Sequence, residues 1–128
     1  MPATAMAVET FALWVSPTGR FRLLHWDTVA TPDRALCCTT ARPIDLTTQL
    51  IMWVDEDALL LDQPLNGPAC ALLSTYQALP SPYFGDIVFT GSTDAQGNIL
   101  GLTQDQALML VDRYLQRPAL LPRPRRTT

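Results

Sequence analysis

A run of five consecutive apolar residues, Leu50 to Val54, places the strongest constraint on how this chain folds. Successive side chains of a strand point to opposite faces of a sheet, so a run without polar positions predicts a central strand that is buried on both faces. The segment Gly85–Gly91 reads Gly-Asp-Ile-Val-Phe-Thr-Gly and is bracketed by glycines. These two segments are the clearest strand predictions in the chain.

A hairpin is predicted near the start of the chain. Residues 11–15 form a short apolar, β-prone run, and Arg20–Trp26 begins with alternating polar and apolar residues, as expected for a returning strand. Between them, Pro17 presets φ at the second turn position and Gly19 relaxes the exit from the turn.

Further strand predictions are weaker. Asp94–Asn98 has the composition of a hairpin turn, and residues 99–102 are predicted to return as a strand. Leu59–Leu65 contains Pro64 and is predicted to form an extended edge segment, because proline is tolerated at a sheet edge.

A C-terminal helix is predicted from capping and periodicity. Thr103 and Gln106 have the spacing of a capping box, and apolar residues follow at helical intervals to about residue 116. Leu108, Val111 and Leu115 are expected to anchor this helix on the sheet, each contributing about 1.5–3 kcal/mol through burial.

A shorter middle helix is predicted over residues 68–77, with Asn66 as its N-cap and Pro68 in its first turn. Residues 27–43 have no clean period, and we expect them to be irregular apart from one helical turn near residues 33–37.

The predicted fold is one α+β domain over residues 10–117. A mixed or antiparallel sheet of about five strands would pack against the C-terminal helix and the shorter middle helix. Residues 1–9 are expected to be loose, and the basic, proline-rich tail 118–128 is expected to be disordered.

Charge is sparse and unevenly placed. Only 16% of the residues are charged while 48% are apolar, which excludes a chain that is disordered throughout. Residues 43–112 contain nine acids and no lysine or arginine, whereas residues 113–128 contain five arginines and no acid. The net charge of −3 argues against direct nucleic-acid binding, and the asymmetry points to an interaction surface.

Two sets of charged residues are candidates for binding. The acids could face a basic partner protein, with the solvation of turns as the alternative: Asp55, Glu56, Asp57, Asp62 and Asp86. The basic residues could grip phosphates, with a solvated strand face as the alternative: Arg20, Arg22, Arg123, Arg125 and Arg126.

Catalytic and metal chemistry have little support in the sequence. His25 is the only histidine, and its spacing places Asp27 on the same strand face, but no Gly-X-Ser-X-Gly elbow supplies a nucleophile. Cys37, Cys38 and Cys70 lack the spacing of a zinc knuckle and are expected to be small core residues. We expect no cofactor, no bound metal and no catalytic residue.

The chain resembles a known family, domain of unknown function 3846, over roughly residues 10–116. The motifs that carry the resemblance are Met52-Trp53-Val54-Asp55-Glu56, Pro64-Leu65-Asn66 leading into Ala69–Leu73, Gly85–Gly91, and Gly97–Thr103. Between Asp27 and Thr48 the chain departs from the family, which usually has a helix ending in a Gly-Gly pair where this chain has Cys37-Cys38. The resemblance implies a fold and a phage, plasmid or mobile-element setting, and no activity.

These observations favour a small non-enzymatic accessory or anti-defence protein of a phage or mobile element. Such a protein would bind a host protein, for example one that handles nucleic acid, through an acidic and apolar surface. The alternative is a module that binds or sequesters a nucleotide-type ligand, and a hydrolase using His25 is the least favoured hypothesis. We expect a cytoplasmic location in the bacterial host, no membrane partner, and a capacity to form homodimers.

Overall fold

The computed structural model describes residues 9–27, 30–78 and 81–116, and the predictions for residues 1–8 and for the tail 118–128 lie outside these ranges. Five strands form one antiparallel sheet in the order β2-β1-β5-β4-β3. The strands are β1 (Phe11–Val15), β2 (Phe21–His25), β3 (Ala41–Thr47), β4 (Leu50–Asp55) and β5 (Ile87–Thr90). The helices are α1 (Pro32–Leu36), α2 (Gly67–Leu73) and α3 (Gln104–Leu115).

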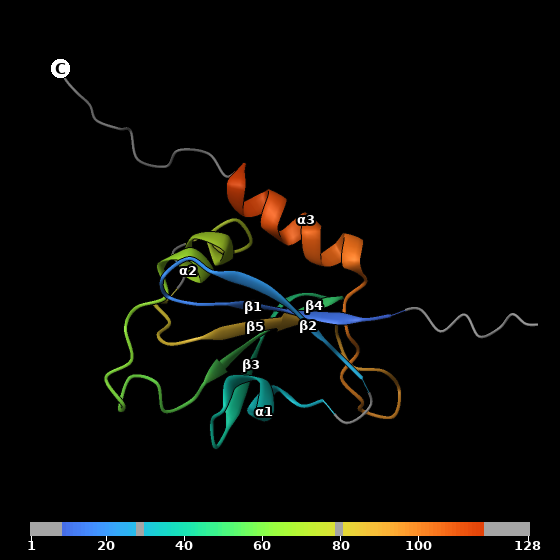
Figure 1. Ribbon diagram of the computed structural model, residues 1–128, viewed down its shortest axis with the longest axis horizontal. Helices are drawn as coiled ribbons and strands as arrows, with labels where there is room; N and C mark the ends of the chain where they lie inside the picture. Colours follow the sequence, from blue (N-terminus) through green and yellow to red (C-terminus); the bar gives the residue numbers. More distant parts are fainter. Residues whose placement is uncertain (1–8, 28–29, 79–80, 117–128) are drawn as a thin grey trace, which may run out of the picture.

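Both faces of the sheet are covered, as the apolar run in β4 requires. One face packs against α2 and α3, and the other packs against α1 and Trp26 (Figure 1). Met52 and Phe89 point to the first face, whereas Trp53 and Val88 point to the second. Every residue of β5 is buried, which confirms that the segment between Gly85 and Gly91 lies inside the sheet.

The α3 helix begins with the predicted capping box. The Thr103 hydroxyl accepts a hydrogen bond from the Gln106 backbone N–H, and the Gln106 side chain accepts one from the Thr103 N–H. The expected anchors are partly wrong, because Leu108 is 48% exposed and Leu115 is 68% exposed. Buried Leu102 fixes the start of α3 through its backbone pairing with Phe11. The helix is therefore rotated about its axis relative to the prediction, and the residues that face the core are Ala107, Leu110, Val111 and Tyr114.

This rotation predicts unequal effects for two neighbouring leucines. Leu110→Ala should lower the free energy of unfolding by about 2–5 kcal/mol, because Leu110 is 4% exposed and its truncation leaves a cavity. Leu108→Ala should cost less than about 1 kcal/mol. Urea denaturation of both variants measures the difference, and equal losses would contradict the observed rotation of α3.

The α2 helix begins as predicted and ends early. Pro68 lies in its first turn, but α2 stops at Leu73 instead of continuing to residue 77. The hydroxyls of Ser74 and Thr75 donate to the carbonyls of Ala71 and Leu72, and such local bonds compete with helix continuation.

Asn66, the N-cap of α2, joins three parts of the structure. Its side-chain amide donates to the Val15 carbonyl (3.0 Å) and to the Gly85 carbonyl (2.8 Å), and its Oδ1 accepts from the Ala69 N–H (3.0 Å). Asn66 is fully buried, and its own N–H donates to the Tyr83 carbonyl. One side chain therefore ties the end of β1, the approach to β5 and the start of α2 together.

Asn66→Asp should lower the free energy of unfolding by at least about 3 kcal/mol. The substitution keeps the side-chain shape but removes both donated hydrogen bonds and places a buried carboxylate oxygen against two carbonyl oxygens. The matched control is Gln49→Glu, an amide-to-acid change at an exposed position, which should stay within about 0.5 kcal/mol of the wild type. A loss below about 1 kcal/mol for Asn66→Asp in urea titrations would refute this role of Asn66.

The strand β3 begins inside the region that was expected to be irregular, at Ala41. The Glu56 N–H donates to the Thr40 carbonyl, and hydrogen-bonded pairs alternate along an antiparallel ladder. The even-numbered residues of β3 are therefore bonded to β4, and the nitrogen of Pro43 lies on the outer side of β3. Proline is tolerated there because no ladder partner needs its N–H, so Pro43 is compatible with an edge strand.

The helical turn expected near residues 33–37 is confirmed as α1. It ends at Cys37, which has a left-handed φ of 51°, while the Cys38 N–H donates to the Asp33 carbonyl. This is the position of a helix end at which glycine is favoured, and here Cys37 adopts the left-handed conformation.

Two expected strands are absent from the described residues. Residues 59–62 form consecutive turns instead of an extended edge, with the Leu61 N–H donating to the Asp57 carbonyl. Residues 99–102 make only isolated bridges, at Ile99 and Leu102. None of the described helices is long and apolar enough to cross a membrane.

Candidate functional site

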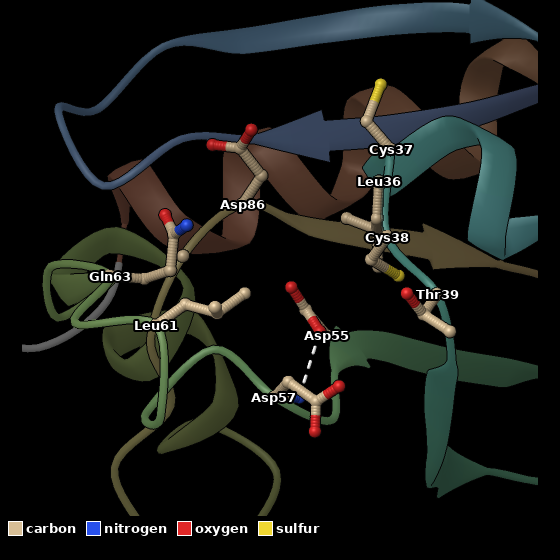
Figure 2. A pocket seen from close by; sticks show the side chains of 10 residues that line it. Leu36, Cys37, Cys38, Thr39, Asp55, Asp57, Leu61, Gln63 and Asp86 are labelled. Atoms are coloured by element: carbon tan, nitrogen blue, oxygen red, sulfur yellow. Dashed lines mark hydrogen bonds between the residues drawn. The ribbon is translucent and has the colours of Figure 1, made fainter.

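An acidic pocket opens where β4 ends and β5 begins. Val54 pairs with Ile87 in these adjacent antiparallel strands, so Asp55, just after this pair, and Asp86, just before it, leave the sheet on the same edge. The last residue of α1 and the three residues after it, 36–39, close one side, and Asp57, Leu61 and Gln63 after β4 close the other (Figure 2). The cavity has a volume of about 390 Å³.

Three carboxylates line the acidic pocket. Asp55 and Asp57 lie close together, because the Asp57 N–H donates to Asp55 Oδ1 at 2.9 Å (Figure 2). Burial raises the pKa of Asp86, while a hydrogen bond from the Trp14 side chain acts in the opposite direction. No arginine is among the described residues that line the cavity, so its carboxylates attract cations and repel anions.

The structure brings together three of the five acidic candidates. Asp55, Asp57 and Asp86 line the pocket, whereas Glu56 and Asp62 are exposed and do not. The Glu56 N–H donates to the Thr40 carbonyl and extends the β3–β4 pairing. Asp62 has a left-handed φ of 55° within the turns, which places it in a local backbone role.

A leucine loop, Leu59-Leu60-Leu61, borders the acidic pocket. The three side chains are 66%, 83% and 61% exposed, and Leu61 also lines the cavity. Neighbouring Ala58 is 4% exposed and holds the loop against the domain. Sequence reasoning missed this surface because it assigned the leucines to an edge strand, although three consecutive leucines between Asp57 and Pro64 were the available signal.

The three cysteines are free thiols, and in the described part of the chain no group of three or more His, Cys, Asp or Glu side chains could hold a metal ion. Burial raises the pKa of the Cys38 thiol to about 11, and Asp55 and Asp33 add to the rise. Cys38 therefore stays protonated at neutral pH and is a weak nucleophile. The thiol of Cys70 lies 3.6 Å from the Tyr83 carbonyl, to which it donates.

His25 lies outside the acidic pocket. Its side chain is 73% exposed, its Nδ1 is 3.7 Å from the Glu9 carboxylate, and its ring contacts Phe11 with centroids 5.2 Å apart. These surroundings supply a charge partner and an aromatic neighbour, but they do not place His25 beside the pocket carboxylates.

The phosphate-binding candidates are also apart from the pocket. Arg20, just before β2, and Arg22, within β2, are both exposed. The Arg22 guanidinium lies 5.0 Å from the centre of the Trp14 ring. The remaining candidates lie outside the described residues: Arg123, Arg125 and Arg126.

Comparison with known protein families places these observations in context. A family model described as a domain of unknown function, DUF3846, matches residues 9–117. The chain belongs to the DUF3846 family. The match spans every strand and helix of this DUF3846 domain as well as the acidic pocket and the leucine loop. No curated protein and no solved structure shows significant similarity to the chain.

Two aspartates of this DUF3846 domain should have pKa values shifted in opposite directions from the ordinary value of 3.8. Carbon-13 NMR of the side-chain carboxyls should give Asp86 a raised pKa because of burial, and Asp94 a lowered pKa because the backbone N–H of Asn98 leads the hydrogen bonds to it.

The stability consequences have opposite signs. The stability that Asp86 contributes is complete below pH 3.8 and is lost as pH rises through its folded pKa. Over that interval the free energy of unfolding of Asp86→Asn should therefore rise relative to that of the wild type. The contribution of Asp94 is present above pH 3.8 and is lost as pH falls, so Asp94→Asn should be the less stable protein at neutral pH. Parallel pH profiles for the two variants would contradict these environments.

Proposed function

We propose that this DUF3846 chain is a non-enzymatic binding protein whose acidic pocket and leucine loop together hold a basic, partly apolar segment of a partner protein. The observation that carries the proposal is that three carboxylates line the same pocket as Leu61, which belongs to a run of three exposed leucines. Charged groups set partner choice and orientation, while desolvated apolar side chains supply most of the binding energy.

The charge of the pocket argues for a protein partner over a nucleotide. Phosphate groups would meet Asp55, Asp57 and Asp86 without a lining arginine to offset them. Arginine or lysine side chains of a partner would instead be attracted. Proteins that handle nucleic acid carry such basic surfaces, so a host protein of this class fits the site.

The wider role we propose is that of a cytoplasmic accessory protein of a phage or mobile element, acting by occupying a host protein such as a defence component. The mobile-element setting rests on what the family resemblance implies. The occupied surface of the host protein would be the basic surface with which it approaches nucleic acid.

Capture from host lysate, with mass spectrometry of the recovered proteins, tests the proposal on the tagged full chain. The triple variant Asp55→Asn, Asp57→Asn and Asp86→Asn should recover at least about tenfold less of a basic partner than the wild type does. Asparagine keeps the Oδ1 acceptor that binds the Asp57 N–H, so the turn is preserved.

The matched control neutralises three exposed acids elsewhere, Asp45→Asn, Asp105→Asn and Asp112→Asn, and should recover the partner normally. Serine at Leu59, Leu60 and Leu61 should reduce recovery as the pocket variant does. Equal recovery by the pocket triple and the wild type would refute the proposal, and so would equal losses for the pocket and control triples.

A further inference from the structure

The two edges of the sheet are not equivalent. The outer edge of β3 is interrupted, because its register with β4 shifts between Asp45 and Thr47 and Pro43 removes one outward N–H. Such features hinder pairing with another strand. The β2 strand instead keeps an unbroken register with β1 from Phe21 to His25 and contains no proline. Among the described residues, no strand or bridge pairs with the outer side of β2.

The backbone groups that β2 presents outward can be assigned. The Trp26 N–H donates to the Thr10 carbonyl, and the Ser16 N–H donates to the Arg20 carbonyl, which fixes the even-numbered residues of β2 as those bonded to β1. Hydrogen-bonded and non-bonded pairs alternate along an antiparallel ladder. The N–H and C=O groups of Phe21, Leu23 and His25 therefore point away from the sheet.

We propose that a second copy of this chain pairs with this edge, β2 against β2, antiparallel and centred on Leu23. A two-fold axis through the Leu23 pair is compatible with the backbone, because this register pairs the three outward-facing residues of one β2 with those of the other. In that register the backbone of Leu23 forms hydrogen bonds with Leu23 of the second copy, and the backbone of Phe21 forms them with His25 of the second copy. Every outward N–H and C=O of β2 then has a partner.

The helix above β2 supplies an apolar flank for the same contact. The Tyr114 ring lies 5.1 Å from the Phe21 ring at the start of β2, whereas Gln106, Met109 and Arg113 face the opposite side, next to Leu50 at the start of β4. Helical periodicity puts Leu108 and Leu115 on the other flank of α3, and both are exposed, as is Leu23 on the sheet face that α3 covers. Around the two-fold axis these leucines would approach the same leucines of the second copy.

The side chains on the other face do not oppose this pairing. Arg22 and Leu24 would lie opposite each other between copies, and each Arg22 guanidinium is already held over its own Trp14 ring. On the Leu23 face, the His25 side chain lies 3.7 Å from Glu9 of its own copy. No acid of β2 meets another acid in this register, because β2 contains none.

The size of the contact sets its strength. The five residues of β2 span about 17 Å, and the sheet with its helix layer is about 20 Å thick, so the contact covers on the order of 350 Å² per copy. Standard stable interfaces bury about 800 Å² per partner. The dimer is therefore concentration-dependent, forming at micromolar or higher concentrations.

Sedimentation velocity of the full chain from about 1 to 300 µM, with hydrogen exchange at both ends of the range, tests the dimer. The expected result is a monomer–dimer equilibrium in which the Leu23 amide exchanges quickly when dilute and at least about tenfold more slowly when concentrated. The Arg22 amide, which bonds to β1, should be protected at both concentrations.

Two variants should weaken dimerisation. Leu23→Pro removes an outward donor without removing a β1–β2 hydrogen bond, and Leu115→Lys places charge on the α3 flank while leaving the β2 backbone intact. Leu60→Lys is the control, because Leu60 is 83% exposed on the leucine loop and away from β2. Thermal melts confirm that each variant is folded.

The proposal would be overturned by a monomer throughout the range, by a dimer unaffected by Leu115→Lys in the folded variant, or by a dimer in which the Leu23 amide stays unprotected. A dimer abolished by Leu60→Lys alone would place the contact on the leucine loop and would also overturn it.

Discussion

The side chain of Asn66 makes the contacts on which the rest of this structure depends. It donates to one carbonyl at the end of β1 and to another just before β5, and it caps α2 with its oxygen. Because the side chain is buried, each of these bonds forms away from competing water, and the loss of any of them is costly. The turns that carry the leucine loop run directly into Asn66, so the same junction fixes where the loop returns to the domain.

The acidic pocket follows from burial of the neighbouring strands. The β4 strand is apolar over five residues and β5 is buried throughout, so the first polar side chains outside this interior emerge together at one edge. Asp55 and Asp86 are those side chains, and the turn that begins with Asp55 adds Asp57. The resulting field is negative and attracts cations, and it adds to the burial that raises the pKa of the Cys38 thiol. The pocket is thus suited to electrostatic recognition of a basic group more than to nucleophilic chemistry.

Local sequence signals were sufficient where local chemistry decides the structure. The capping box at Thr103, the turn at Gly19, the N-cap at Asn66 and the α+β class with a five-stranded sheet were all predictable. The strand β3 was not predictable, because Pro43 fits a strand only at the edge of a sheet, and the position of a strand within the sheet is a tertiary property. The rotation of α3 was missed for a similar reason, since periodicity identifies an apolar stripe but pairing of Leu102 with Phe11 selects Leu110 over Leu108. Three pocket acids were named in advance, yet their convergence required the β4–β5 pairing.

The central claim is that the acidic pocket and the leucine loop recognise one basic, partly apolar segment. An NMR titration of the isotopically labelled full chain with a short peptide of alternating arginine and leucine tests this most directly. The account predicts saturable shifts of the backbone amides around the cavity, at Asp57, Leu61, Gly85 and Asp86. It would be contradicted by the absence of shifts at these amides, or by equal shifts around the exposed acids Asp45, Asp105 and Asp112, which would indicate charge attraction without a site.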